Sequence, residues 1–204
     1  MKFKALLISV VTLAVMSLIA LGGTFALFTD DVTLNTHLKA GNLNVTLTRT
    51  NLVSEVLNTD TGFIKKVTNT DDVDFSGNTT KNVFDVTSDT LIVPGSKFTA
   101  EMQLENKSGV AFNYWIEIVI KSAKNELSEQ LKVTVTTDSE CSATIADGVK
   151  IGSETQPAGT LAKGEKELFY VVVEYQNLDN NNDSQGKSVE FDMVIHAVQA
   201  TTSA

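Results

Sequence analysis

The chain has 204 residues, of which 42% are hydrophobic, and a formal net charge of −9. Its length allows one domain with a substantial core, and its acidity disfavours nucleic acid and anionic lipid as partners because their phosphates repel a negative surface. The single cysteine, Cys141, excludes an internal disulfide, so the chain is not a small disulfide-stabilised scaffold. We interpret Cys141 as a small buried hydrophobic residue, with an intermolecular disulfide or a reactive thiol as the alternative.

The start of the chain has the layout of a secretory signal peptide. A positively charged beginning is followed by an apolar run over residues 5–21. Thr24 and Ala26 then supply small residues at positions −3 and −1 of a cleavage site, so cleavage is predicted before Leu27. We therefore expect residues 27–204 to form a single domain that works outside the cytoplasm.

Two consequences follow from this prediction for residues 1–26. Their removal takes away two lysines, which changes the formal net charge from −9 to −11. The apolar run also approaches the roughly 20 residues that span a bilayer, so an uncleaved membrane anchor is the alternative.

Alternating apolar and polar residues dominate the rest of the chain, a pattern typical of strands with one buried face. Residues 168–175 are apolar on both faces, which predicts a central, fully covered strand. Only residues 125–131 look helical, with Asn125 as the N-cap. The predicted fold class is therefore all-β, a jelly-roll-like antiparallel β-sandwich with one short helix near residues 125–131 and an N-terminal signal helix. The other predicted strands fall within residues 28–38, 43–48, 98–105, 112–120, 133–135 and 189–197.

Residues 50–90 differ from the rest because Thr, Asn, Asp and Ser crowd there. Scattered apolar positions predict one or two short strands within a polar excursion, not a second domain. An acidic cluster at Asp71, Asp72 and Asp74 is interpreted as a solvated loop.

Candidate metal ligands are few. The two histidines, His37 and His196, lack the His-Glu-x-x-His context of helical zinc proteases and fall in predicted strands. Four other residues have the spacing of a calcium loop, although its central glycine is missing and its predicted flanks are strands; they are Asp179, Asn181, Asp183 and Glu190. A polar hairpin tip explains the same four residues. We therefore expect no catalytic residue, no metal and no cofactor.

Short motifs occur in order along nearly the whole chain, at residues 22–30, 38–43, 93–98, 104–109, 131–135, 161–165 and 197–200. Together they resemble the TasA/camelysin family of exported bacterial surface proteins. The resemblance implies a jelly-roll subunit of extracellular matrix fibres, trimmed by a dedicated signal peptidase. It also implies assembly in which the N-terminal segment of one subunit completes the sheet of the next. Residues 50–90 match the family least, and Leu27 replaces a smaller residue at the cleavage region.

The N-terminal segment has the properties that strand donation requires. A donated strand needs an apolar face and backbone groups that can extend a sheet, and no proline interrupts this segment. Gly41 can act as the hinge that follows it. A head-to-tail contact of this kind does not close and therefore builds a filament. The expected interface residues on the apolar face are Phe28, Val32, Leu34 and Leu38.

The leading hypothesis is thus a self-assembling structural subunit of extracellular or surface fibres, processed by a signal peptidase. Whether an anchoring or nucleating companion protein takes part stays open, and no nucleic acid partner is expected. In the alternative arrangement, residues 28–38 form an ordinary first strand of their own subunit. The alternative functions are a monomeric secreted binding or adhesion module and, because the family includes proteins described as metalloproteases, an extracellular protease.

Overall fold

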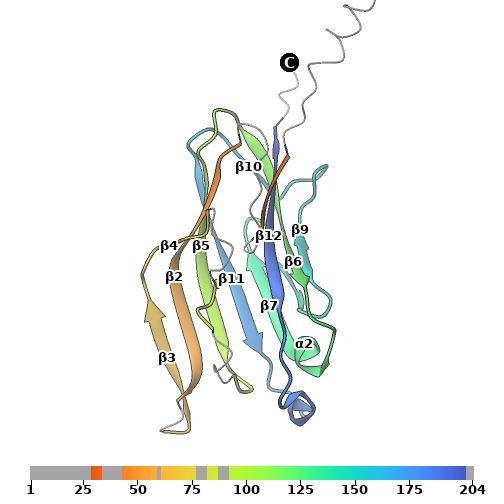
Figure 1. The fold of residues 1–204 in the computed structure, drawn as a ribbon. Coiled ribbons are helices and arrows are strands. Elements are labelled where there is room, and N and C mark those ends of the chain that lie inside the picture. Colours follow the sequence, from red (N-terminus) through yellow and green to blue (C-terminus); the bar gives the residue numbers. More distant parts are fainter. Residues whose placement is uncertain (1–28, 34–42, 59–60, 77–81, 87–91, 201–204) are drawn as a thin grey trace, which may run out of the picture.

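The structure, a computed structural model, describes residues 29–33, 43–58, 61–76, 82–86 and 92–200. Two antiparallel sheets face each other as a β-sandwich, which confirms the predicted all-β class (Figure 1). No helix in these described ranges is long and apolar enough to cross a bilayer.

The smaller layer, sheet A, has five strands in the order β1-β12-β6-β10, with β9 also paired to β6. Every pairing in it is antiparallel. Its strands are β1 (Thr29–Thr33), β6 (Phe112–Ile120), β9 (Val149–Ile151), β10 (Gly159–Leu161) and β12 (Phe191–Gln199).

The larger layer, sheet B, has seven strands in the order β3-β2-β5-β11-β7-β8, with β4 also paired to β2. Two short helices, α2 (Glu126–Gln130) and η1 (Asn181–Ser184), lie close to each other at one end of the sandwich (Figure 1). The strands of sheet B are β2 (Val45–Asn58), β3 (Phe63–Asn69), β4 (Val73–Asp74), β5 (Lys97–Asn106), β7 (Leu131–Thr136), β8 (Cys141–Thr144) and β11 (Lys166–Tyr175).

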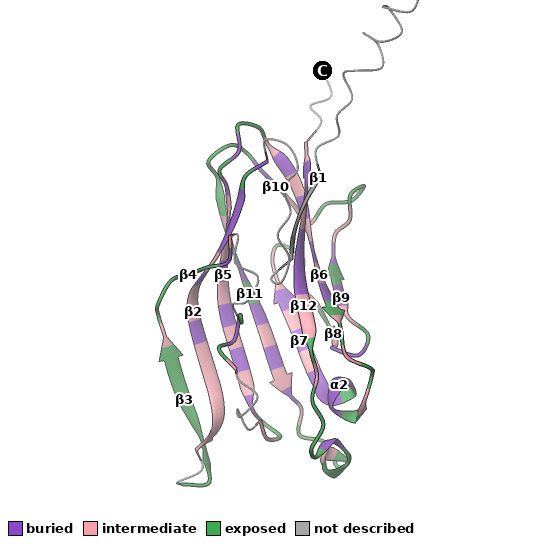
Figure 2. Cartoon of the chain, viewed as in Figure 1, coloured by how far each residue is buried: buried purple, intermediate pink, exposed green. Residues whose placement is uncertain are grey.

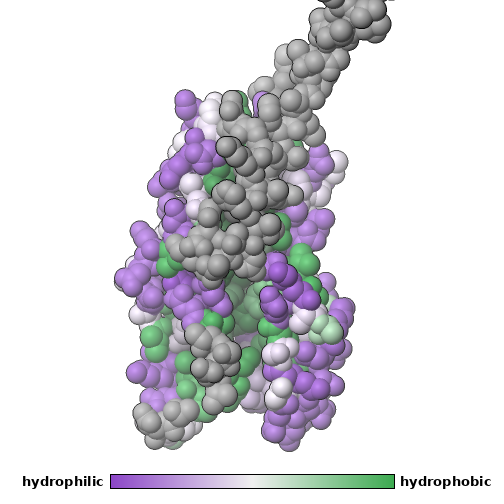
Figure 3. All heavy atoms as spheres, viewed as in Figure 1, coloured by the Kyte–Doolittle hydropathy of each residue, from purple (hydrophilic) through white to green (hydrophobic). Residues whose placement is uncertain are grey.

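The core lies between the two sheets and follows from the period-two pattern. Successive side chains of a strand point to opposite faces, so every second residue of β5, and of β6 as far as Ile118, is buried (Figure 2). Hydrophilic residues make up most of the described surface on the face shown in Figure 3. Burial of the inward-facing rows of β5 and β6 stabilises the sandwich by about 25 cal/mol per Å² of apolar surface. The two rows consist of Phe98, Ala100, Met102 and Leu104 in β5, and Phe112, Tyr114, Ile116 and Ile118 in β6.

The predicted helix is confirmed as α2, and its start shows why it forms. The Asn125 Oδ1 accepts a hydrogen bond from the Ser128 backbone N–H at 3.0 Å. In return, the Ser128 Oγ accepts one from the Asn125 N–H at 2.9 Å. These two bonds satisfy donors that a helix N-terminus leaves unpaired.

The prediction for residues 168–175 is correct in position and wrong in coverage. β11 is central, because it pairs with β5 on one side and β7 on the other. Its outward face is open, however, with Leu168 50% and Tyr170 41% exposed. The Tyr170 hydroxyl donates to Glu101 Oε2 at 3.0 Å, so this ring lies along the sheet surface with its polar end paired. Cys141, predicted to be buried, is partly buried and packs against the core from β8.

Residues 50–90 contain two short strands, β3 and β4, where one or two were predicted, and also the second half of β2. The region is more than a surface decoration, because four of its apolar side chains belong to the core. These are Leu52, Phe75, Val83 and Phe84, each less than a tenth exposed.

Gly159 allows β10 to pass close to a buried tyrosine. It pairs with Tyr114 of β6, and a Cβ at Gly159 would lie 2.6 Å from a ring carbon of Tyr114 and 2.8 Å from its hydroxyl oxygen. Any side chain larger than hydrogen must therefore displace a fully buried ring.

We expect Gly159→Ala to lower the free energy of unfolding by about 1–3 kcal/mol, the usual penalty for overpacking a core. Urea denaturation followed by the fluorescence of Trp115 measures this change. Gly109→Ala is the matched control, because nothing lies within 4 Å of a Cβ at Gly109. Equal stability of the two variants would contradict the assignment of Gly159 as a contact residue.

Candidate assembly site

The edge of sheet A contains the described part of the predicted donor segment. β1 runs antiparallel to β12, opposite residues 194–198. Val32 of the predicted apolar face lies in this strand, with its Cα paired with that of Ile195. In the single chain, the segment therefore pairs within its own molecule. The other predicted cleavage and assembly residues lie outside the described ranges, namely Thr24, Ala26, Leu27, Phe28, Leu34, Leu38 and Gly41.

β12, the strand that β1 pairs with, carries apolar residues on both faces, although His196 lies on the same face as Val194 and Val198. Met193, Ile195 and Ala197 belong to the core between the sheets. On the opposite face, Val194 is 9% exposed and Val198 is 4% exposed. A strand with β6 on one side and apolar residues on both faces offers a neighbouring strand backbone pairing together with hydrophobic contact.

A histidine lies in the middle of this pairing. The His196 ring stacks on Trp115 of β6, with centroids 4.7 Å apart and planes 6° apart. Its Nε2 is 3.2 Å from Glu117 Oε2, which forms an ion pair when the imidazole is protonated. In the register of β1, Asp31 is opposite His196. His196 is thus a strand histidine with polar and aromatic partners, at the centre of the β1–β12 ladder.

The metal candidates do not converge in the described part of the chain. Among those residues, no group of three or more His, Cys, Asp or Glu side chains is placed to hold a metal ion. His37 lies outside the described ranges. Asp179 precedes η1, Asn181 and Asp183 lie in η1, and Glu190 immediately precedes β12.

Asn181 has a structural part in its loop. Its side-chain amide donates to Gln130 Oε1 at 3.1 Å and to the Gln176 carbonyl at 3.0 Å. Its side-chain Oδ1 accepts a hydrogen bond from the Leu178 backbone N–H at 2.5 Å. The atom that a calcium loop would use as a ligand is therefore engaged with the backbone of the loop.

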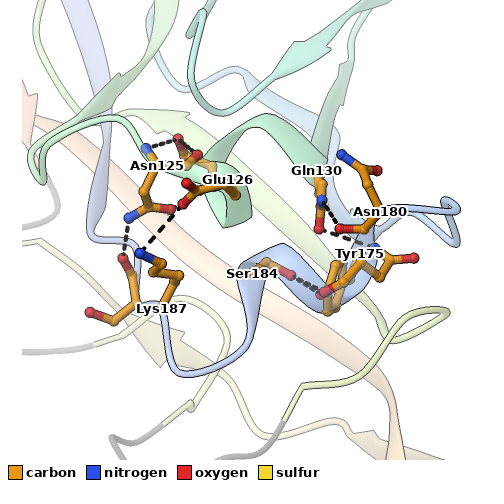
Figure 4. Close-up of polar contacts among 10 residues, drawn as sticks. Asn125, Glu126, Gln130, Tyr175, Asn180, Ser184 and Lys187 are labelled. Carbon is orange, nitrogen blue, oxygen red and sulfur yellow. Dashed lines mark hydrogen bonds and ion pairs between the residues drawn. The ribbon is translucent and has the colours of Figure 1, made fainter.

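Further polar contacts join this loop to α2 (Figure 4). Gln130 Nε2 donates to the Asn180 carbonyl at 3.1 Å, and the hydroxyls of Tyr175 and Ser184 share a hydrogen bond. The Lys187 ammonium lies 3.6 Å from a carboxylate oxygen of Glu126. The pKa of Glu126 is lowered, mainly by a hydrogen bond from the backbone at the helix start and secondly by the positive charge of Lys187. These contacts join α2, which lies between β6 and β7, to the loop between β11 and β12. They explain the polar residues that the sequence concentrates in that loop.

Sequence reasoning missed a buried cation in sheet B. Arg49 of β2 is 0% exposed and lies in the same inward row as Leu47. Its Nη1 donates to the Val83 carbonyl at 2.6 Å, and its Nη2 is 2.7 Å from Asp85 Oδ2. A charged residue within an alternating apolar row was the signal that could have identified it.

Arg49 fixes a segment that bridges the two sheets. Between its two partners lies Phe84, whose ring makes an edge contact with Phe98 of sheet B at 5.9 Å between centroids. The same ring lies 6.4 Å from Phe191 of sheet A. Asp85 adopts a positive φ of 52°, which is uncommon for a residue other than glycine. We call residues 82–86 the bridging segment.

Comparison with known proteins gives one result. No curated protein and no solved structure matches the chain significantly. A family model described as "Camelysin metallo-endopeptidase" matches residues 2–204, almost the full length. The chain therefore belongs to the camelysin family, which includes TasA.

Proposed function

We propose that this protein is a structural subunit of extracellular or surface fibres. Residues 1–26 direct its export and are removed by a signal peptidase, and residues 27–204 form the single-domain subunit. Membership of the camelysin family, which is associated with extracellular and surface proteins, supports this location. The two-sheet sandwich supplies the stable body that a fibre subunit needs.

Subunits join by strand donation, in which the N-terminal segment of one chain pairs with β12 of the next. The observation that carries this proposal is the β1–β12 ladder at the edge of sheet A. Because donor and acceptor belong to the same sequence, the same register can form between two chains as within one. When β1 of one chain replaces β1 of its neighbour, the same residues pair with β12, and only the chain that supplies β1 changes.

Protein concentration then decides between the closed monomer and the polymer. Intramolecular pairing satisfies β12 in an isolated chain, and intermolecular pairing gains from mass action as the concentration rises. Each chain donates one segment and accepts another, so the contact is heterologous and continues without closing.

Electron microscopy of the exported chain over a range of concentrations tests this proposal. We expect unbranched fibres above a threshold concentration and monomers below it. A chain that stays monomeric at every concentration would instead favour a secreted binding or adhesion module, for which the intramolecular β1–β12 pairing is the supporting observation.

An extracellular protease is the second candidate, because the matching family is described as a metallo-endopeptidase. His37 and His196 are the only histidines of the chain and are the first ligands to test. Casein hydrolysis that a chelator abolishes, and that His37→Ala and His196→Ala each remove, would support this activity.

A further inference from the structure

The edge strand β3 exposes an unusual number of apolar side chains. Phe63 is 76% exposed, Ile64 44% and Val67 46%. These three residues belong to one strand of seven residues at the end of sheet B (Figure 2). Exposed apolar edge strands are places where another strand can add to a sheet, and proteins usually protect them.

Alternate side chains of β3 are on the inward face of sheet B, the face that packs on the core, but they lie beyond the edge of the core. Lys65 pairs with Val56, which packs against the core from β2. By the alternation of a strand, Phe63 and Val67 share the face of Lys65, and all three are exposed. Lys66 points to the opposite face. The inward row thus extends the apolar surface of sheet B to its open edge.

The direction of the strands makes the two ends of sheet B complementary. The path from β3 to β8 contains six strands, each antiparallel to its neighbour. The first and last strands therefore run in opposite directions. If a second copy is placed beside the first by translation alone, its β8 runs antiparallel to β3 and can continue the sheet.

The charges of the two edges are also complementary. β3 carries Lys65 and Lys66 in a chain with a net charge of −9. The exposed residues Asp138 and Glu140 precede β8, and no Lys or Arg lies between residues 133 and 149. Antiparallel pairing of β3 with a second β3 would instead bring lysines together, which is destabilising.

We propose that β3 of one subunit pairs with β8 of a second copy of this chain, so that sheet B continues from one subunit to the next. This contact uses the ends of sheet B, whereas strand donation uses the edge of sheet A. It is therefore a second self-association surface that joins subunits or fibres side by side, and it does not depend on strand donation.

Cysteine cross-linking tests this pairing, because Cys141 is already present in β8. Cys141 pairs with the buried Val135 and therefore points to the inward face of sheet B, as Lys65 does. Cross-strand cysteines can form a disulfide only when they share a face. In the exported chain, we expect Lys65→Cys to yield a ladder of disulfide-linked oligomers on non-reducing gels after mild oxidation.

Lys66→Cys is the matched control, since its side chain points to the other face, and it is expected to give at least tenfold less of this ladder. The ladder should also disappear in Lys65→Cys/Cys141→Ser. Equal cross-linking of the Lys65→Cys and Lys66→Cys chains would overturn the proposal. Dimers that persist without Cys141 would overturn it as well, because they would indicate pairing of β3 with β3.

A charge-reversed chain gives a measurement that does not depend on disulfide geometry. Lys65→Glu/Lys66→Glu is expected to reduce the side-by-side association of the exported chain at least tenfold, as measured by sedimentation velocity. Both positions are exposed, so the fold should keep its far-ultraviolet circular dichroism. Unchanged association of a folded double variant would contradict the proposed contact.

Discussion

Deletion of residues 27–38 is expected to leave a chain that stays monomeric at concentrations at which the exported chain forms fibres. The deletion removes β1 and the predicted apolar face around it, while β12 and its partner β6 remain. A chain without a donor can accept a strand and cannot pass one on, so growth stops. Electron microscopy and sedimentation velocity measure the loss, which we expect to be complete.

A synthetic peptide with the sequence of residues 27–38 is the control that keeps this experiment decisive. The peptide should bind the shortened chain and fill its β12 edge, which shows that the acceptor is folded. A scrambled peptide of the same composition should not bind. Fibres formed by the shortened chain at normal concentrations would contradict strand donation.

Replacement of Arg49 by alanine is expected to lower the free energy of unfolding by about 3 kcal/mol. The change removes two charge-assisted hydrogen bonds, to the Val83 carbonyl and to Asp85, and leaves a cavity in the core. We place the loss at the lower end of the range for buried ion pairs, because the Asp85 side chain is 48% exposed. Guanidinium denaturation monitored by Trp115 fluorescence measures the effect.

Two further variants separate the cause of this loss. Arg49→Met keeps much of the apolar volume and removes the charge, so we expect a smaller destabilisation than for alanine. Lys163→Ala removes an exposed cation from a turn and should stay within about 0.5 kcal/mol of the parent chain. Hydrogen exchange should increase in the bridging segment of the alanine variant. A stability loss below about 0.5 kcal/mol for Arg49→Ala would mean that Phe84 alone fixes this segment.

The sequence predicted most of the strands because each has a simple pattern. In β5, residues 97–106 alternate without interruption, and the structure buries every second one. The cap at Asn125 could be predicted for a similar reason, because capping depends on a few neighbouring residues. The residues of a segment are sufficient to predict its structure where burial follows from their own alternating pattern.

The same reasoning failed where burial depends on distant contacts. Leu168 and Tyr170 are apolar, and only the arrangement of the two layers shows that sheet B has an open outer face. Arg49 is polar, and its burial depends on Asp85, which lies 36 residues away in the sequence. The edge position of β3 is likewise a property of the whole sheet and cannot be derived from its seven residues.

The assembly site could be predicted only in part. The apolar pattern of residues 28–38 and their lack of proline follow from the sequence, and the structure places Val32 in β1 at the edge of sheet A. Its role in an interface stays a prediction. The identity of its partner does not follow from the sequence, because β12 is more than 150 residues away along the chain. Under the proposed strand donation, the pairing between two chains would have the same register as the pairing within one.

Cross-linking between two differently substituted chains distinguishes these two cases most directly. One chain carries Asp31→Cys and the other His196→Cys, the two positions that pair in the β1–β12 register, and both carry Cys141→Ser. Strand donation predicts disulfide-linked pairs of the two chains in mixed fibres. If the chains link only when both cysteines are in the same molecule, β1 does not leave its own subunit and the account is wrong.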